Sequence, residues 1–204
     1  NFIFIIKKRN DDKNKNKGLK FRYYYFEEKI KLGKKRNLLN DYALGDIIVC
    51  LDDDDYYPPQ RVSHAVSQLE KKKNFLIAGS SILYYYYNHI KKIYQYGPYG
   101  PYHATNGTFA YRKEYLKNHR YEDDAEQSEE SFFTNNFSEP LIQLDTYKTM
   151  LCIVHDNNTF DKVAMLGKPE YLSKLSMYKL KQFVKDKKLR DFYTEINIKK
   201  NNEI

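Results

Sequence analysis

Residues 45–55 read GDIIVCLDDDD, and this stretch decides the fold. Its apolar centre, Ile47 to Leu51, is a continuous run rich in β-branched side chains, which is typical of a buried parallel strand. Four aspartates begin where that strand must end, and the Tyr-Tyr-Pro-Pro sequence of residues 56–59 stops it. The stretch therefore predicts a buried strand with four carboxylates at its carboxyl end.

The four aspartates, Asp52 to Asp55, point to a metal-assisted site. Ligands bind at the carboxyl ends of the strands in an open α/β sheet, and four like charges repel one another there unless a cation lies among them. A hard divalent ion with oxygen ligands neutralises such a cluster and keeps places free for phosphate oxygens. The alternative is a solvated loop, because acidic runs and Asp-rich turns after strands are common.

Length and composition predict one folded domain. The chain has 204 residues, of which 41% are hydrophobic and 16% aromatic, which is enough to build a core and excludes a disordered chain. We expect a single domain over residues 1–204, with residues 186–204 as a polar tail. The formal net charge of +8 suits nucleic acid or a nucleotide diphosphate, but much of the excess lies at residues 7–20 and 179–200.

The two cysteines and the hydropathy pattern exclude several classes of protein. Cys50 and Cys152 lie in apolar runs and are expected to be small buried hydrophobic residues, not a disulfide or a zinc site. No apolar run approaches the roughly 20 residues that a membrane helix needs, and no signal-peptide pattern is present. We therefore expect a cytoplasmic protein without a membrane span.

Strand and helix patterns alternate along the chain. Apolar runs predict strands at residues 1–6, 19–26, 46–51, 75–78, 107–111 and 150–154, and a hairpin with arms at 80–87 and 90–96. Helical spacing predicts helices at residues 34–44, 60–72, 112–118, 132–137 and 171–185. This alternation favours an α/β fold with a largely parallel sheet.

Three motifs around the acidic run carry a resemblance to a known family. Residues 33–37 read GKKRN, residues 43–48 read ALGDII, and residues 51–62 read LDDDDYYPPQRV. Their order and spacing resemble family 2-like glycosyltransferases, which show a Gly, an Arg-Asn pair, an Ala-x-Gly-Asp turn, a strand ending in Asp-x-Asp-Asp, and Pro-x-Arg-hydrophobic. Weaker likenesses continue as far as Asn158, through residues 103–108 and 128–130. The resemblance implies a GT-A-like, Rossmann-like fold with a mixed, largely parallel sheet flanked by helices.

The resemblance implies roles for the acidic residues in holding Mn²⁺ or Mg²⁺. Asp52 and Asp54 match the family's Asp-x-Asp, whose carboxylates meet the metal ion that bridges the phosphates of a nucleotide-sugar. Such an ion stabilises the charge that grows on the departing diphosphate. Asp53 and Asp55 remain candidates, because a run of four aspartates allows the register to shift by one.

The nucleotide side is expected to involve the Arg-Asn pair. By the same resemblance, Arg36 and Asn37 would line the nucleotide, together with Asp52 and Asp53. For Arg36 the alternative is a cation on the surface of a helix.

Glu130 is the expected catalytic base. An inverting transfer needs a group that takes the proton of the acceptor hydroxyl, and in the family this is the last carboxylate of an acidic pair that opens a helix. Glu129 and Glu130 form such a pair here, with Glu129 as the second choice. The alternative is that both glutamates only stabilise the dipole of a first helical turn.

Three further residues complete the expected site. His155 follows the strand predicted at residues 150–154, and the resemblance implies that it is a late metal ligand; the alternative is a structural hydrogen-bonding histidine. Gly107 and Thr108 resemble the segment on the acceptor side, where a missing side chain lets a substrate approach the backbone.

The amino-terminal part departs from the family pattern. The family's first strand and helix have no counterpart here, and Phe2 to Ile6 matches only the second strand. That strand runs into Lys7-Lys8-Arg9-Asn10 in place of an acidic pair. We therefore expect an N-terminally truncated copy, or an incomplete nucleotide pocket.

The expected function is a metal-dependent, inverting glycosyltransferase. It would move a sugar from a nucleotide-sugar, with a UDP-sugar as the first choice, to a hydroxyl of a glycan or a protein. The main alternative is a degenerate, non-catalytic module that binds a nucleotide or a carbohydrate. A further alternative is another metal-dependent enzyme, such as a nucleotidyltransferase, which could use the same carboxylates. No nucleic-acid partner is expected, because a packed acidic cluster repels phosphate unless it is loaded with metal.

Overall fold

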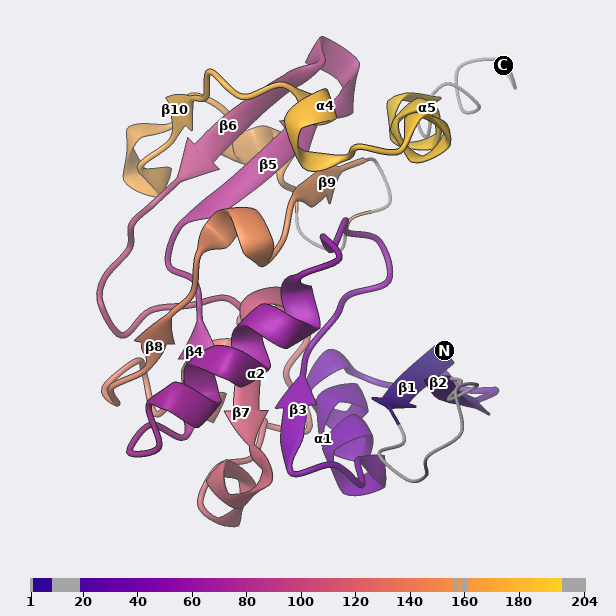
Figure 1. Ribbon diagram of the computed structural model, residues 1–204, viewed down its shortest axis with the longest axis vertical. Helices are drawn as coiled ribbons and strands as arrows, with labels where there is room; N and C mark the ends of the chain where they lie inside the picture. The colour runs from indigo at the N-terminus through magenta and orange to yellow at the C-terminus, as the bar shows by residue number, and fades with distance from the viewer. Residues whose placement is uncertain (1, 9–18, 156–157, 159–160, 196–204) are drawn as a thin grey trace. The chain divides into compact units, whose positions relative to one another are not determined.

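The computed structural model describes residues 2–8, 19–155, 158 and 161–195, with side chains from residue 22 onward. The chain divides into two compact units: unit 1 takes in Asn1–Ile48 and Arg112–Asn136, and unit 2 takes in Val49–Tyr111 and Phe137–Ile204. Figure 1 shows the elements of both. The single domain expected over residues 1–204 stays a prediction.

Unit 1 combines a hairpin with helices. Strand β1 (Phe2–Lys8) pairs antiparallel with β2 (Leu19–Tyr25), and α1 (Leu32–Tyr42) follows. The remaining elements are the 3₁₀ helix η3 (Lys113–Lys117) and α3 (Glu129–Phe133). The two strands and the first helix are confirmed as predicted, whereas the helix predicted at residues 112–118 is a short 3₁₀ helix.

The amino terminus of α1 is docked on residues 121–125 of the same unit. The backbone N–H of Gly33 donates to the carbonyl oxygen of Ala125 over 3.0 Å, and that of Lys34 donates to Asp123 over 3.2 Å. A Cβ atom on Gly33 would lie 1.8 Å from the carbonyl oxygen of Glu122. The glycine that opens the GKKRN motif is therefore required by close backbone packing.

Unit 2 is built on two four-stranded sheets (Figure 1). The first has the order β3-β7-β4-β8, with strands at Ile47–Val49, Ala110–Arg112, Ile77–Gly79 and Ile142–Gln143. The second has the order β10-β6-β5-β9, with strands at Lys174–Leu175, Lys92–Tyr96, Leu83–Tyr87 and Cys152–Val154. Ile47 and Ile48 of β3 and Arg112 of β7 belong to the sequence of unit 1.

The helices of unit 2 are few and short. Helix α2 (Arg61–Lys71) packs against β4 with Ala65 and Leu69 fully buried, so the amphipathic helix predicted at residues 60–72 is confirmed. The other helical elements are α4 (Leu180–Phe183), α5 (Lys187–Glu195), and the 3₁₀ helices η1 (Asn88–Ile90), η2 (Asn106–Thr108), η4 (Thr146–Lys148), η5 (Val163–Met165) and η6 (Pro169–Tyr171).

Both sheets of unit 2 are mixed. Strand β4 pairs parallel with β8 and antiparallel with β7, while β5 pairs parallel with β9 and antiparallel with β6. The α/β fold with a mixed sheet is therefore confirmed, but parallel pairing has a smaller share than expected. The cause is local, because β5 and β6 are joined by the short η1, and a parallel pair needs a crossover of a dozen or more residues.

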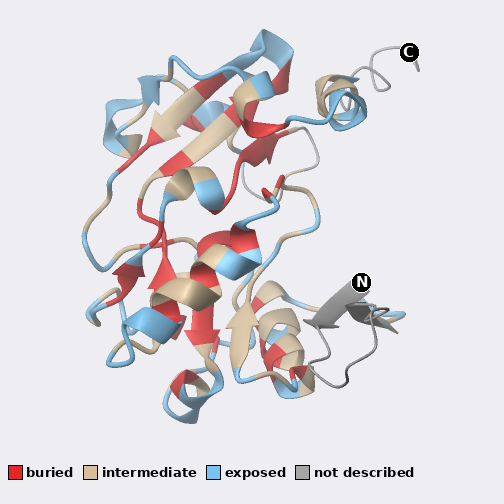
Figure 2. Ribbon diagram, viewed as in Figure 1, coloured by how far each residue is buried: buried red, intermediate tan, exposed pale blue. Residues whose placement is uncertain are grey.

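Two buried clusters of unit 2 lie on the faces of the β10-β6-β5-β9 sheet. Figure 2 shows buried segments along β5, β6 and β9. One buried cluster consists of Tyr56, Tyr86, Ile93, Leu151, Ile153, Phe183 and Val184. The other consists of Leu83, Tyr87, Tyr96, Met150, Cys152, Val154 and Met165. Period-2 alternation in β5 and β9 therefore sends successive side chains to opposite faces.

The strand before the aspartates is shorter and less buried than predicted. The expected buried strand at residues 46–51 is reduced to β3, whose three residues are only partly buried. Leu51 is 39% exposed. The apolar sequence of this strand predicted that both of its faces are covered. Because β3 is an edge strand of its sheet, its side chains are covered less completely.

The helix predicted at residues 171–185 is wrong. This segment forms the end of η6, then β10, then the four-residue α4. Lys174 and Leu175 pair with Gln95 and Tyr94, so the chain completes the edge of β6. The helical spacing within residues 171–185 could not predict this strand, because the strand forms by pairing with the open edge of β6, which lies elsewhere in the sequence.

The polar tail expected at residues 186–204 stays a prediction. Residues 187–195 of the predicted polar tail form α5, and residues 196–204 lie outside the described part of the chain. Within the described ranges, no helix is long and apolar enough to cross a membrane.

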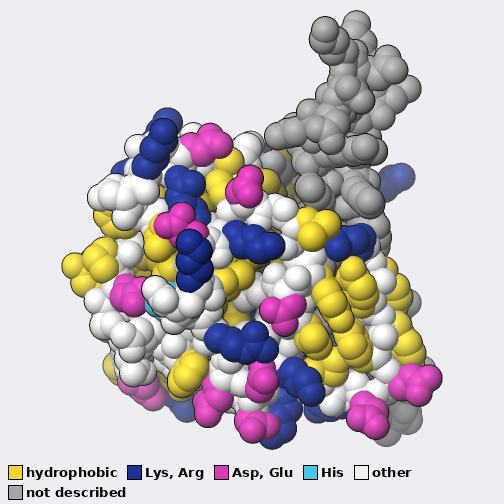
Figure 3. All heavy atoms as spheres, turned by 90° about the horizontal axis from the view of Figure 1, so that it is seen from below, with side chains coloured by type: hydrophobic (Ala, Val, Ile, Leu, Met, Phe, Trp, Pro, Cys, Tyr) yellow, Lys and Arg dark blue, Asp and Glu magenta, His cyan; other side chains and the backbone are white. Residues whose placement is uncertain are grey.

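Charged side chains of both signs are interspersed on the face drawn in Figure 3. Exposed ion pairs join Lys31 to Asp124 in unit 1 and Lys148 to Asp145 in unit 2, each at 3.1 Å. The net charge of +8 is therefore not gathered into one basic patch among the described residues of that face.

Candidate functional site

Asp52 to Asp55, the acidic turn, follow β3 in unit 2 and have different surroundings. Asp53 is exposed, whereas Asp52, Asp54 and Asp55 are partly buried. Of these four residues only Asp53 is exposed as a whole, and which of the four carboxylates would hold a metal ion stays a prediction.

Asp52 lies against the backbone of Gly107. Its N–H donates to the hydroxyl of Tyr57 over 2.8 Å. A Cβ atom on Gly107 would lie 2.7 Å from Asp52 Oδ2 and 3.1 Å from the hydroxyl oxygen of Tyr57. Gly107 therefore makes room for the Asp52 carboxylate, which explains a glycine here without an acceptor substrate.

Arg61, the first residue of α2, joins the acidic turn to the segment before β7. It is only 2% exposed, and its Nη2 donates to the carbonyl oxygens of Cys50, Gly107 and Phe109 over 3.1, 3.4 and 2.8 Å. Burial lowers the pKa of this guanidinium, while Tyr57, Cys50 and Asp52 act in the opposite direction. The buried cation is stabilised by carbonyl dipoles around it.

Asp54 converges with two side chains that follow β9. Its Oδ2 lies 3.4 Å from His155 Nε2 and 3.1 Å from Asn158 Nδ2. The side chain of His155 is 9% exposed and that of Asp54 is 37% exposed. The structure thus brings two of the three predicted metal ligands together at the surface of unit 2.

Asp55 faces the interior of unit 2. Its Oδ1 accepts a hydrogen bond from the N–H of Ile153 over 2.8 Å, and Lys162, whose Nζ donates to Cys152 Sγ over 3.0 Å, is its nearby cation. Burial raises the pKa of Asp55 to about 6 against the opposing charge of Lys162, and the neighbouring Asp54 and Asp52 raise it further. Asp55 therefore fastens the acidic turn to β9.

The residues at Asp54 fit a divalent cation in part. Within the described ranges, no group of three or more His, Cys, Asp or Glu side chains is arranged to hold a metal ion. Two donors do converge, a carboxylate oxygen and an imidazole nitrogen, and both are ligands that Mn²⁺ accepts. Mg²⁺ and related ions are commonly held by one or two carboxylates with substrate phosphates completing the shell, so the pair suits an ion that binds together with a diphosphate.

In unit 1, the Arg-Asn pair of α1 is engaged with the protein itself. Arg36 Nε donates to Glu129 Oε1 over 3.3 Å, and both side chains are nearly buried. Asn37 Nδ2 donates to the carbonyl oxygen of Tyr121 and to Asp123 Oδ1, and its Oδ1 accepts from the N–H of Tyr121. Their nucleotide contacts stay a prediction, and their observed role is to hold residues 121–129 on α1.

The two glutamates of α3 are distinguished by their surroundings. Glu129 is 5% exposed and is the partner of Arg36, whereas Glu130 is only partly buried. Of the two carboxylates, Glu130 is the one better placed to meet a substrate. Its role as base stays a prediction.

The side chain of Thr108 makes its hydrogen bonds within the protein. Its hydroxyl donates to the carbonyl oxygen of Thr105 over 2.7 Å and accepts from the N–H of Ser80 over 3.0 Å. The residue is fully buried. Acceptor binding by Gly107 and Thr108 therefore stays a prediction, and only a backbone contact at Gly107 remains open to it.

Sequence reasoning did not single out Arg61, Lys162 or Asn158 as residues of the site. The role of Arg61 could have been found from the sequence, because this residue belongs to the Pro-x-Arg motif that follows the four aspartates. Asn158 had only its place at the end of the weaker likeness, and Lys162 had no signal; both residues follow β9 in the sequence.

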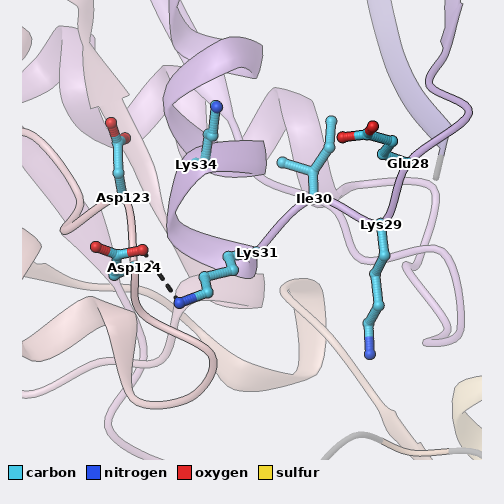
Figure 4. Close-up of a pocket in the computed structure, with 7 residues that line it drawn as sticks. All are labelled: Glu28, Lys29, Ile30, Lys31, Lys34, Asp123 and Asp124. Atoms are coloured by element: carbon cyan, nitrogen blue, oxygen red, sulfur yellow. Dashed lines mark hydrogen bonds and ion pairs between the residues drawn. The ribbon is translucent and has the colours of Figure 1, made fainter.

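A cavity of about 290 Å³ lies in unit 1 beside the first turn of α1 (Figure 4). It is lined by Glu28, Lys29, Ile30, Lys31, Lys34, Asp123 and Asp124. Figure 4 shows Lys31 reaching toward Asp124. Charges of both signs line this cavity, and the N–H groups of Gly33 and Lys34 are already bonded, so it does not favour an anion.

Asp55→Asn is expected to flatten the pH dependence of stability. The pKa of Asp55 in the folded protein, about 6, lies above the ordinary value of 3.8. Protonated Asp55 therefore stabilises the folded protein fully below about pH 4, and this stabilisation is lost as the pH rises through about 6. A shift of this size corresponds to about 3 kcal/mol. Urea unfolding in EDTA from pH 4 to pH 7 measures it. The exposed Asp53→Asn serves as control, and equal slopes in Asp55→Asn and the original chain would contradict the assignment.

The comparisons with known proteins agree with the sequence motifs. A family model described as glycosyl transferase family 2 matches residues 8–138. The comparison with curated proteins found no match. The matched region includes the acidic turn, Gly107 and Glu130, whereas His155 and Asn158 lie beyond it.

The family implies a GT-A fold and a glycosyltransferase that uses a nucleotide-sugar donor and an acceptor. The match covers more than half of the chain and takes in sequence from both units. The mixed α/β architecture is consistent with it. The chain therefore belongs to glycosyl transferase family 2.

Proposed function

We propose that this glycosyltransferase is metal-dependent and inverting, and that it moves a sugar from a UDP-sugar to a hydroxyl of a glycan or a protein. The observation that carries the proposal is the convergence of Asp54 Oδ2, in the turn after β3, and His155 Nε2, directly after β9; the two atoms are 3.4 Å apart. The proposed ion is Mn²⁺ or Mg²⁺, held by Asp54 and His155, with Asp52 as the further carboxylate of the Asp-x-Asp pair.

The acidic turn needs positive charge to meet a diphosphate. When bound, a divalent cation supplies that charge and stabilises the diphosphate as it departs. The protein itself orients the carboxylates. Arg61 bonds the carbonyl groups of Cys50, two residues before Asp52, and of Phe109, and Asp55 fastens the turn to β9. Asp53, which is exposed, is proposed to contact the nucleotide from the solvent side.

Glu130 is proposed as the general base. In the reaction, the acceptor oxygen forms a bond to the anomeric carbon, the bond from that carbon to the diphosphate oxygen breaks, and Glu130 takes the proton of the acceptor hydroxyl. Inversion follows because attack and departure occur on opposite faces of the sugar. The partial burial of Glu130 supports this role, while the ion pair of Arg36 with Glu129 holds α3 in place.

The alternative of a non-catalytic binding module has one observation in its favour. Arg36 and Asn37, the residues expected on the nucleotide, are bonded to Glu129 and to residues 121–123. Calorimetry with UDP and Mn²⁺, followed by a donor-turnover assay, separates the two functions. Binding without any turnover would favour the module.

A nucleic-acid partner is not supported. Charges of both signs are interspersed on the face drawn in Figure 3, and the acidic turn carries like charge to phosphate. A cytoplasmic location is proposed on the sequence pattern alone.

Asp54→Ala is expected to lower kcat/KM for sugar transfer by at least about 100-fold, because it removes one of the two converging donors. Metal-dependent UDP binding should be lost with it. Asp53→Ala, the same change at the exposed carboxylate, should cost much less. Transfer rates and UDP calorimetry measure both. Undiminished transfer by Asp54→Ala, with circular dichroism unchanged, would contradict the metal role of Asp54.

Glu130→Gln is expected to lower kcat by about 10²–10⁴-fold with little change in the KM for the donor, because an amide cannot accept the proton. Glu129→Gln, the matched change one residue earlier, should lower stability through the loss of the Arg36 ion pair and leave most of kcat. Steady-state kinetics and thermal unfolding measure the pair. A larger kcat loss in Glu129→Gln would move the base to Glu129.

A further inference from the structure

The side-chain amide of Asn158 lies between the two converging donors. Its Oδ1 accepts a hydrogen bond from the backbone N–H of His155 over 2.9 Å. This bond fixes the orientation of the amide, because only the carbonyl oxygen can accept from an N–H. The donor nitrogen Nδ2 must therefore face the side chains of Asp54 and His155.

Three acceptors surround that one nitrogen. Asn158 Nδ2 lies 3.1 Å from Asp54 Oδ2, 2.9 Å from His155 Nε2 and 3.4 Å from the carbonyl oxygen of Ile153. Since Nδ2 only donates, His155 Nε2 must accept, which places the imidazole proton on Nδ1. A carboxylate lone pair and an imidazole lone pair are thus aimed at the same point, which is the arrangement that a divalent cation requires.

We propose that the Asn158 amide competes with the divalent cation for Asp54 and His155. The amide N–H groups satisfy both lone pairs, so a cation can reach them only when the amide moves away. One of the two bonds that are given up, the bond to Asp54, has a charged acceptor and is therefore stronger than a neutral hydrogen bond. This inference rests on the proposed function, because it takes the Asp54–His155 pair to be the cation site.

The competition has a consequence for the order of binding. Two protein donors that are already bonded to an amide hold a free cation weakly. A cation that arrives with a nucleotide diphosphate brings phosphate oxygens as further ligands, and these offset the loss of the amide contacts. Asn158 therefore weakens binding of the ion alone, whereas the added phosphate ligands allow the ion to bind together with the nucleotide-sugar in spite of the same cost.

Asn158→Ala and Asn158→Ser test the competition. Both remove the amide that bonds Asp54 and His155, and the serine hydroxyl keeps a short acceptor near the N–H of His155. The expected result is a 5- to 50-fold tighter Kd for Mn²⁺ alone, of the order expected for losing one or two competing hydrogen bonds. Titration of the free Mn²⁺ signal by electron paramagnetic resonance measures the Kd without nucleotide and without turnover.

The controls separate this inference from the proposed function. Asn74→Ala removes an exposed amide between α2 and β4 and should leave the Kd unchanged. Adding Asp54→Ala to Asn158→Ala should abolish the gain. A Kd that is unchanged or weaker in both Asn158 variants, while binding still depends on Asp54, overturns the competition alone. The absence of Asp54-dependent Mn²⁺ binding in every variant overturns both the competition and the proposed metal site.

Discussion

The buried guanidinium of Arg61 is the constraint on which the candidate site depends. Its Nη2 bonds the carbonyl groups of Cys50, Gly107 and Phe109, so the end of β3 and the segment before β7 share one cation. The carboxylate of Asp52 lies in the space that a side chain on residue 107 would fill. A buried cation that has to be satisfied by carbonyl dipoles fixes the backbone around it, and the carboxylates that follow Cys50 start from a set position.

The elements that depend on the periodicity of their own segment were predictable from the sequence. Helix α2, the β5–β6 hairpin and the strands of unit 1 were all expected, because each depends on periodicity within its own segment. Residues 171–185 were predicted wrongly because the open edge of β6 recruits Lys174 and Leu175 as a strand. The share of parallel pairing was overestimated for a related reason, since pairing direction depends on connections that periodicity does not specify.

The site was predictable in its acidic residues and less so in its surroundings. A run of four aspartates after an apolar strand pointed to Asp54, and a histidine at the end of β9 pointed to His155; the two lie together. Sequence alone did not distinguish Asp55, whose carboxylate faces the interior, from the surface residue Asp53. Nor did it reveal Asn158, because a single asparagine in a loop carries no pattern and acquires a role only through the contacts of the folded chain.

In the proposed site, one divalent ion is held by Asp54 and His155 and meets the diphosphate of the donor. Pulsed electron paramagnetic resonance of the protein with Mn²⁺ and UDP tests it most directly. The account predicts a ¹⁴N coupling from a directly bound imidazole together with ³¹P couplings from the diphosphate, and loss of the nitrogen coupling in His155→Ala. Phosphorus couplings without any imidazole nitrogen, or a nitrogen coupling that persists in His155→Ala, would contradict the account.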